Sequence, residues 1–463
     1  MSSKITIQSL HQSYLSNPDS LFTHLQAYTR RIREKNESIR AFLYIQELKQ
    51  PYFPSVPKML PPLFGIPIAI KDNIWVENMP CTSASKMLET FIPPEDATVI
   101  KRIKQAGGLI SGKTNMDEFA MGSSTENSAF FPTRNPYHLD YVPGGSSGGS
   151  TAAVAADMSL CALGSDTGGS IRQPASFCGV VGIRPTYGLV SRHGLIGFSS
   201  SLDQIGPIAR TVEDAFQLLS VIAGYDESDD TSLPVQWKDL TEKKPTTIAV
   251  LDEIEHLEMD KEVFDLYQKC KQWLAKHFRI ITCHIPSFQY ALSAYHIIAD
   301  SEASSNLSRM GGDSAFYPPF EESYEKTVIE LRTSKLGEEV KRRILLGAFT
   351  LSSRFKEGYY QHAFYAKEHI KREFEFVFQQ ADAIFTPTTI TAAFPFGTRM
   401  DPRKMYYSDI CTIPSALAGL PALSIPVGLN ENGLPVGMQF IGNPLSEKTL
   451  YRLSQWMETS WHA

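Results

Sequence analysis

VPGGSSGGSTAAVAADMSLCALGSDTGGSIRQPAS, residues 142–176, is the stretch around which the rest of the chain is organised. It holds two glycine–serine clusters, 144–150 and 164–170, separated by an alanine-rich segment that favours helix and by a short apolar strand predicted at 160–163. Glycine allows positive φ angles, so several backbone N–H groups can converge on one point. Such a loop stabilises the oxyanion that develops when a carbonyl group is attacked. Because each cluster ends in a serine, the stretch predicts a site where a serine attacks a carbonyl carbon.

A serine nucleophile needs a base, and the sequence offers more than one way to supply it. His138 and His193 lie outside the stretch and have no motif around them, although a Ser-His-Asp arrangement stays open because triad members need not be neighbours. A lysine whose pKa is lowered by burial can also act as base. The candidate is Lys71, which ends the apolar run at 63–70. The alternative is that Lys71 only marks the point where a strand leaves the core.

Three motifs occur in a characteristic order, and together they resemble the amidase signature family. They are GIPIAIKDN (65–73), GGSSGGS (144–150) and GSDTGGSIRQP (164–174). Members of that family use a Ser–Ser–Lys triad. The resemblance implies that Ser170 forms the acyl-enzyme, that Ser146 relays the proton and that Lys71 is the base. It also implies a cis peptide between Gly145 and Ser146, and an oxyanion hole formed by the backbone N–H groups of Thr167, Gly168, Gly169 and Ser170.

Composition excludes several other classes of protein. The 463 residues are 42% hydrophobic and 20% charged, which is ordinary for a soluble globular protein. A net charge of −6 without a long basic run argues against a protein that primarily binds nucleic acid. The N-terminus lacks the apolar core of a signal peptide and no stretch is long enough to span a membrane, so we expect a cytoplasmic protein. Six scattered cysteines without a CxxC pair predict buried reduced thiols and no metal site.

Alternating strand and helix patterns predict an α/β fold with one large central sheet, and the family resemblance implies a mixed sheet covered by helices on both faces. Strands are predicted at the Lys71 segment and at 109–111, 180–183, 247–251, 383–385, 422–425 and 436–440, and helices at 18–35, from Asp96 to before Gly107, at 211–223 and at 446–459. We expect a single domain over residues 1–463. Residues 1–60 form a helical and proline-rich lead-in, and residues from about 253 to 380 form a helical insertion.

The segment GGLISGKT, residues 107–114, fits the phosphate-loop pattern GxxxxGK[ST]. A phosphate loop requires a strand before its first glycine and a flexible loop between its glycines. Here a predicted helix precedes the first glycine, and Leu109 and Ile110 favour a strand in the interval. We therefore expect no nucleotide site at this position.

Five further segments resemble the A subunits of aspartyl/glutamyl-tRNA amidotransferases, a branch of the same family, and this resemblance covers nearly the whole chain from about residue 20. They are 113–130, 200–215, 301–309, 337–347 and 408–428. In that family the A subunit hydrolyses glutamine and sends the ammonia to a partner subunit. The enzyme is a carbon–nitrogen ligase that converts Glu-tRNA(Gln) or Asp-tRNA(Asn) to the amide. One departure is residues 310–316, where family members usually carry a DG(I/V)RYG-like segment.

The same resemblance implies the assembly and its cofactors. A heterotrimer with B and C subunits is expected, in which charged tRNA binds through the B subunit; no membrane is involved. This chain itself is expected to hold no cofactor, with ATP and Mg²⁺ at the partner subunit.

Glutamine carries a carboxylate and an ammonium group, so its pocket should supply one cation and one anion. The resemblance places the cation at Arg343, with Arg342 as the alternative, and the anion at Asp409. Two other functions stay open. A free-standing amidase acting on another small amide would keep the triad without needing these charges. A catalytically silent assembly partner would not need Lys71, Ser146 and Ser170 together.

Overall fold

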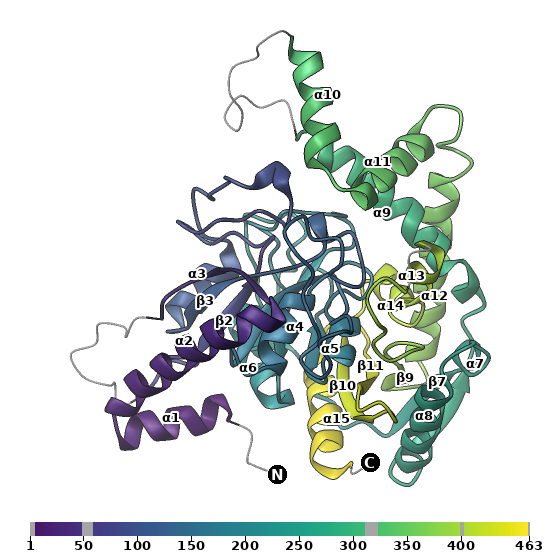
Figure 1. The fold of residues 1–463 in the computed structure, drawn as a ribbon. Coiled ribbons are helices and arrows are strands. Elements are labelled where there is room, and N and C mark those ends of the chain that lie inside the picture. The colour runs from purple at the N-terminus through teal and green to yellow at the C-terminus, as the bar shows by residue number, and fades with distance from the viewer. Residues whose placement is uncertain (1–4, 49–58, 311–322, 399–401, 462–463) are drawn as a thin grey trace.

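The computed structural model describes residues 5–48, 59–310, 323–398 and 402–461 (Figure 1). Its central element is one mixed sheet, in which eleven strands of the described residues run in the order β1-β3-β2-β4-β6-β5-β10-β11-β9-β7-β8. The strands are β1 (Phe42–Ile45), β2 (Pro67–Lys71), β3 (Leu109–Thr114), β4 (Cys161–Asp166), β5 (Val181–Arg184), β6 (Gln204–Ala209), β7 (Thr247–Leu251), β8 (Arg279–Cys283), β9 (Ala383–Pro387), β10 (Ala422–Leu429) and β11 (Pro435–Ile441).

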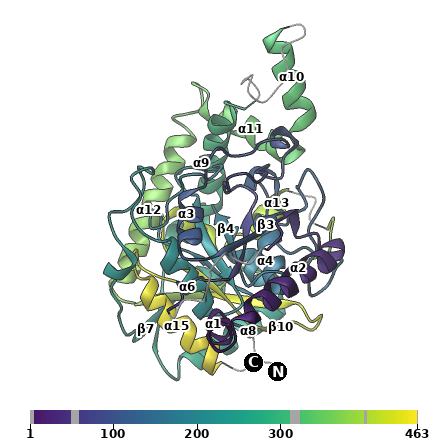
Figure 2. The ribbon, with the colours of Figure 1, turned by 90° about the vertical axis from the view of Figure 1, so that its left-hand side faces the viewer.

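Helices surround this sheet, and α10 extends away from the rest of the molecule in both views (Figures 1 and 2). The described helices are α1 (Ile7–Ser16), α2 (Asp19–Ile39), α3 (Thr98–Gln105), α4 (Gly148–Ala155), α5 (Arg172–Phe177), α6 (Val212–Ile222), α7 (Asp252–Glu255), α8 (Lys261–Leu274), α9 (Ala291–Leu307), α10 (Tyr324–Lys335), α11 (Glu338–Leu351), α12 (Tyr360–Phe378), α13 (Pro402–Tyr407), α14 (Ile413–Leu417) and α15 (Glu447–Ser460). The predicted α/β class is confirmed.

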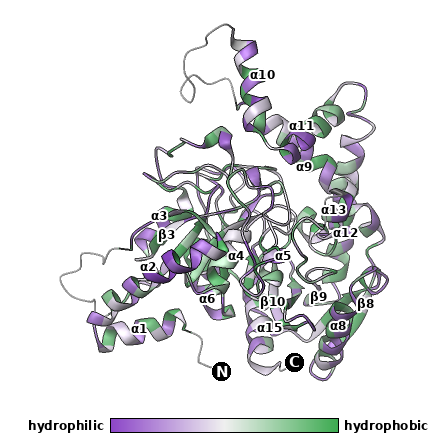
Figure 3. Cartoon of the chain, viewed as in Figure 1, coloured by the Kyte–Doolittle hydropathy of each residue, from purple (hydrophilic) through white to green (hydrophobic). Residues whose placement is uncertain are grey.

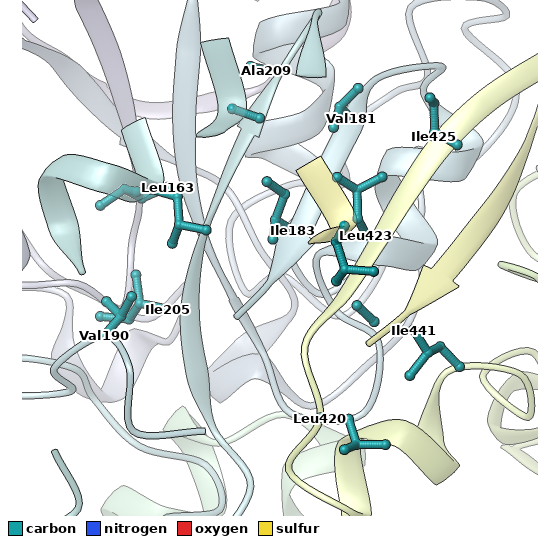
Figure 4. Packing of buried hydrophobic residues seen from close by; sticks show 14 of the residues in the cluster. Leu163, Val181, Ile183, Val190, Ile205, Ala209, Leu420, Leu423, Ile425 and Ile441 are labelled. Atoms are coloured by element: carbon teal, nitrogen blue, oxygen red, sulfur yellow. The ribbon is translucent and has the colours of Figure 1, made fainter. Parts of the chain in front are cut away.

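The two faces of the sheet are buried in separate cores because successive strand residues point to opposite sides. Ile68 and Ile70 of β2 belong to the larger core, together with apolar residues of α3 and α6. Ala69, between them, belongs to a second core that contains α4 and α5. Figure 4 shows part of the larger core, where side chains of β4, β5, β6, β10 and β11 gather. Outer helices carry both kinds of surface, as the mixed colours of α2 show in Figure 3.

The predicted strands and helices form close to where the sequence places them, with two kinds of difference: several strands are longer than expected, and three strands were not expected. The strand expected at 160–163 continues to Asp166, because its ladder with β6 reaches Gln204. β6 was not predicted, since Gly206 and Pro207 interrupt its apolar pattern. β1 and β8 were also not predicted, and β8 lies inside the segment expected to be a helical insertion. The lead-in contains α1 and α2, while its residues 49–58 lie outside the described residues.

The phosphate-loop pattern at 107–114 lies on a strand, as expected. α3 precedes it, and β3 includes Gly112, Lys113 and Thr114. The Lys113 side chain is fully buried, and its amine lies 3.4 Å from a carboxylate oxygen of Asp72. That amine therefore neutralises a buried carboxylate and does not face a phosphate site.

All six cysteines are buried and unpaired. Within the described ranges, no helix combines enough length with enough hydrophobicity to cross a membrane.

Candidate active site

The site forms at one edge of the sheet, where two neighbouring parallel strands end. β2 ends at Lys71, and β4, which pairs with it in parallel, ends at Asp166. Because the carboxyl ends of adjacent parallel strands meet at one edge, the loops that follow them lie together. The loop after β4 carries residues 167–170, and the turn before α4 carries Ser146. The fold thus brings Lys71, Ser146 and the predicted oxyanion loop to one place.

Lys71 is fully buried, and its amine has three close neighbours. Nζ lies 2.7 Å from Oγ of Ser146, 2.9 Å from Oγ of Ser165 and 3.2 Å from the Ser165 carbonyl oxygen. Burial lowers the pKa of Lys71 to about 7, although the carboxylates of Asp117, Asp203 and Asp166 act in the opposite direction. The neutral amine can donate its two N–H groups to Ser165 and accept the Ser146 hydroxyl proton on its lone pair.

Ser146 follows a cis peptide bond from Gly145, which is the geometry that the family resemblance implies. The backbone N–H of Gly145 donates to Oε1 of Gln173 at 2.9 Å. The next residue, Ser147, donates its N–H to the carbonyl of Ser170 at 3.1 Å, so the two glycine–serine clusters are joined directly. No hydrogen bond within the described residues links the hydroxyls of Ser146 and Ser170. Catalytic hydrogen bonds often close only around the substrate.

The loop that carries Ser170 is held by a buried ion cluster. Arg172 donates to both carboxylate oxygens of Asp166, at 3.0 and 3.1 Å, and Arg184 donates to the same carboxylate at 3.1 Å. Burial alone would raise the pKa of Asp166, but the two guanidinium groups hold it well below its usual range. The carboxylate also accepts the backbone N–H of Ile171 at 3.2 Å. These contacts fix both ends of the 167–170 loop.

At the predicted oxyanion hole, neighbouring side chains pack closely against the backbone of this loop. Gly169 has a φ of +147°, a conformation that favours glycine, and a Cβ there would lie 2.2 Å from Oγ1 of Thr412. Oγ1 of Thr412 donates to the carbonyl of Gly168 at 2.6 Å, and Oγ1 of Thr167 donates to Asp203 at 2.6 Å. Across the described chain, no hydrogen bond uses the N–H groups of Gly168 and Gly169. These donors are free for an oxyanion.

The two charges predicted for glutamine both lie in buried positions. Arg343 is 4% exposed, its Nε donates to Glu339 at 2.8 Å, and its guanidinium lies 5.4 Å from the Phe198 ring centroid and 5.1 Å from that of Tyr406. Burial acts to lower the pKa of Arg343, but Asp300 and Glu339 raise it above its usual value. The alternative, Arg342, is 45% exposed in its side chain and pairs with the other carboxylate oxygen of Glu339. Of the two arginines, only Arg343 is buried.

Asp409 is the predicted anion, and one of its carboxylate oxygens is bonded while the other is free. Oδ2 accepts the Ser123 hydroxyl at 2.5 Å, whereas Oδ1 is buried without a hydrogen-bond partner among the described residues. Burial raises the pKa of Asp409 to about 7. Such a carboxylate would be satisfied by a bound ammonium group.

Tyr295 of α9 connects these charges with the oxyanion loop. A Cβ added at Gly168 would lie 2.9 Å from the Tyr295 hydroxyl, so the ring packs directly on the loop. Burial raises the pKa of Tyr295, and the charges of Arg343 and Asp409 also act on that hydroxyl. Contacts link both charges to this loop: Phe198, under the Arg343 guanidinium, donates its N–H to the carboxylate that accepts the Thr167 hydroxyl. The Thr412 hydroxyl lies 3.0 Å from the Asp409 carbonyl oxygen and 2.6 Å from that of Gly168. The segment at 310–316, whose sequence differs from the usual family pattern, lies outside the described residues except for Met310.

Several supporting residues were not singled out in the sequence. Ser165, Asp166, Arg172 and Gln173 lie inside the quoted stretch, so their signal was their place in the motif. Asn73 ends the first motif, and four others lie in segments that carry the subunit resemblance without being singled out there: Asp117, Ser123, Asp203 and Thr412. Tyr295 lies outside every quoted segment, so no signal in the sequence marks it.

Comparisons with known proteins show which family this chain resembles. Residues 24–451 match the amidase family. The A subunit of glutamyl-tRNA(Gln) amidotransferase from Cyanothece sp. is 46% identical over 478 residues, covering 99% of this chain and 98% of that one. The crystal structure of the corresponding A subunit from Thermotoga maritima is 42% identical with a TM-score of 0.84, covering 99% of this chain and 95% of that one.

A structure with another activity is also similar. The native peptide amidase of Stenotrophomonas maltophilia is 26% identical with a TM-score of 0.78, and the match covers 99% of this chain and 97% of that one. The fold alone is therefore shared by enzymes that act on different amides.

Proposed function

Because this chain belongs to the amidase family, we propose that it is the glutamine-hydrolysing A subunit of a tRNA-dependent amidotransferase. The observation that carries the proposal is that two buried opposite charges are linked through short chains of contacts to the 167–170 loop. A buried arginine, Arg343, and a buried carboxylate with a free oxygen, Asp409, both act on Tyr295, which packs on the oxyanion loop. These charges match the carboxylate and ammonium of a free amino acid, and the relatives that are amidotransferase A subunits support the same assignment.

The acylation step uses the neutral form of Lys71. Oγ of Ser170 attacks the side-chain amide carbon of glutamine while its proton passes to Ser146, and the Ser146 proton passes to Nζ of Lys71. The carbonyl oxygen becomes an oxyanion, which the N–H groups of Gly168 and Gly169 stabilise. When the tetrahedral intermediate collapses, the C–N bond breaks. The leaving nitrogen takes a proton back from the Lys71 ammonium through Ser146 and departs as ammonia.

The acyl-enzyme is a glutamyl ester on Ser170, which water hydrolyses. Lys71 and Ser146 accept a proton from the attacking water, and the C–O bond to Ser170 breaks with return of that proton to Oγ. The products are glutamate and ammonia. Throughout these steps Arg343 holds the α-carboxylate and Asp409 holds the ammonium group, which fixes the amide carbon in front of Ser170.

Ammonia is then used by a partner. In our proposal the chain assembles with B and C subunits in the cytoplasm. The partner subunit binds charged tRNA together with ATP and Mg²⁺, and converts Glu-tRNA(Gln), or Asp-tRNA(Asn), to the amide. This chain binds neither nucleotide nor metal for its own reaction. Its phosphate-loop pattern is a buried strand.

The competing function is a free-standing amidase, as in the peptide amidase that shares the fold. Such an enzyme would need the triad but would gain nothing from two opposite charges at Arg343 and Asp409. A catalytically silent partner would not need Lys71 buried against Ser146.

The deciding experiment measures glutamate and ammonia release from glutamine by the isolated chain and by the chain with B and C subunits, ATP and charged tRNA. A subunit that supplies ammonia to a partner should hydrolyse glutamine slowly alone and faster in the assembled complex. A partner shifts the equilibrium towards the active state only if it binds that state more tightly. A panel of unrelated amides serves as control. Full activity alone, with equal turnover of those amides, would establish the free-standing amidase instead.

A further inference from the structure

The loop formed by residues 117–127, here called the 117–127 loop, contacts three separate parts of the site. Asp117 accepts the backbone N–H groups of Thr125 and Asn127 at 2.9 and 3.1 Å, and a Cβ added at Gly145 would lie 2.1 Å from its carboxylate. Ser123 donates to Asp409 at 2.5 Å. The loop therefore touches both the serine relay and the anion that we assign to the glutamine ammonium group.

Its third contact is made by Glu118 and reaches the helix that carries Arg343. Glu118 is 1% exposed. One carboxylate oxygen accepts the Ser85 hydroxyl at 2.5 Å, and the other accepts the backbone N–H of Gly337 at 2.8 Å. Gly337 is the N-cap residue of α11 and has no side chain with which to cap it. Glu118, distant in sequence, thus satisfies a backbone donor that the helix start leaves open.

A larger residue at position 337 would displace the Glu118 carboxylate. A Cβ added at Gly337 would lie 2.4 Å from Oε2 of Glu118. A second close contact fixes the other half of the helix, because a Cβ added at Gly347 would lie 1.9 Å from the carbonyl oxygen of Asp300 in α9. Arg343 lies between these two points, in the second turn of α11.

We propose that Glu118 is a positioning residue that sets the place of Arg343 and thereby the selectivity of the site for amides bearing an α-carboxylate. This inference rests on the proposed function, since it assigns the glutamine carboxylate to Arg343. Glu118 joins the start of α11 to the loop that carries Asp117 and Ser123, so one short segment relates the carboxylate site to the serine relay and to Asp409. A displacement of α11 would move Arg343 relative to Ser170 without altering the triad.

The test uses the chain assembled with its B and C subunits and compares glutamine with 4-aminobutanamide, the same amide without the α-carboxylate. Glu118→Ala should raise KM for glutamine on the order of tenfold while kcat changes less than about twofold. Its kcat/KM for 4-aminobutanamide should stay within about twofold of the unmodified complex. Glu118→Gln should restore the low KM, because its oxygen can accept from Gly337 and its amide can donate to Ser85.

Two further variants control for indirect effects. Glu338 lies in the first turn of the same helix, and its side chain is 87% exposed. Glu338→Ala should therefore leave the kinetic constants for both substrates unchanged. Gly337→Ala should reproduce the KM defect from the other side of the contact. An equal loss for both substrates in Glu118→Ala would overturn the inference, because it would mean that Glu118 acts on the triad.

Amide hydrogen exchange over residues 337–343 provides a measurement that does not depend on glutamine turnover. Exchange there should be faster in Glu118→Ala than in Glu338→Ala, because only the first variant releases the helix start. Unchanged exchange would overturn the anchoring role. If the unmodified complex releases no ammonia from glutamine, the proposed function fails, and this exchange comparison still decides whether Glu118 holds α11.

Discussion

Nζ of Lys71 lies 2.7 Å from Oγ of Ser146, and both side chains are fully buried. The contact joins the last residue of a central strand to the turn before α4, across 75 residues of sequence. The amine also donates to the hydroxyl oxygen and to the carbonyl oxygen of Ser165. Burial lowers the pKa of this lysine, because it removes the water that would stabilise the ammonium form.

The first prediction concerns the pH dependence of acylation. Since the pKa of Lys71 is lowered to about 7, the base is protonated and inactive below this pH and neutral above it. The rate of acyl-enzyme formation at saturating glutamine should therefore rise with pH and level off above about 7. Rapid-mixing measurements of ammonia release between about pH 5 and about pH 9, roughly two units on either side of neutrality, would follow this limb.

Asp117→Asn is the matched variant for this profile. Three carboxylates raise the pKa of Lys71 against the effect of burial, and Asp117 has the largest effect of the three. Removing its charge should lower the pKa of Lys71 further, so the limb should move to lower pH. A limb that stays in place would show that it belongs to another group.

The second prediction separates two buried lysines on neighbouring strands. Lys71→Met removes the base and should reduce kcat on the order of a thousandfold, with the protein still folded. Lys113→Met leaves the buried carboxylate of Asp72 without its cation, and should lower the free energy of unfolding by about 3–5 kcal/mol. Urea unfolding and glutamine hydrolysis, measured on both variants, would test this contrast. Equal loss of activity at equal stability would contradict it.

The third prediction concerns glutamine binding at Asp409. The pKa of this carboxyl is raised to about 7, so it loses its charge as the pH falls below that value. Because the charged form pairs with the substrate ammonium, KM for glutamine should rise below about pH 7. Asp409→Asn should raise KM roughly tenfold and make it independent of pH in this range. A KM that keeps its pH dependence in the variant would remove Asp409 from the binding site.

The fourth prediction concerns the ion cluster beneath the oxyanion loop. Asp166→Ala leaves Arg172 and Arg184 buried without a carboxylate between them. This should lower the free energy of unfolding by about 3–5 kcal/mol. Thermal unfolding of this variant and of Asp265→Ala, whose carboxylate pairs with Lys261 on the surface, provides the comparison. The surface variant should change stability by less than about 1 kcal/mol.

Most of the sheet could be predicted because its strands are short apolar runs, and the order of the motifs placed Lys71 and the two serine clusters together. Strands with unusual composition could not. β6 contains Pro207 opposite Leu163 in the middle of the sheet, so its sequence resembles a loop. β8 is short and lies within a charged, helix-rich segment, where its place at the sheet edge beside β7 depends on tertiary contacts.

The site shows the same division. Residues within one motif could be related to one another, and Arg343 and Asp409 could be assigned only through the family resemblance. Contacts between distant segments could not be predicted, because nothing local marks them. Ser123 reaches Asp409 across 286 residues, and Glu118 reaches Gly337 across 219. Ser123, Asp409 and Glu118 are polar residues in segments that contain other polar residues, and Gly337 contributes only its backbone N–H.

The most direct test of the central claim is mass spectrometry of the chain after rapid quenching with glutamine, or after reaction with an electrophilic glutamine analogue. Both treatments should add the mass of the glutamyl group or of the analogue to the peptide that carries Ser170. The Ser170→Ala variant should show neither adduct and release no ammonia from glutamine, while its thermal unfolding stays unchanged. A covalent adduct on another residue, or ammonia release by Ser170→Ala, would contradict the account.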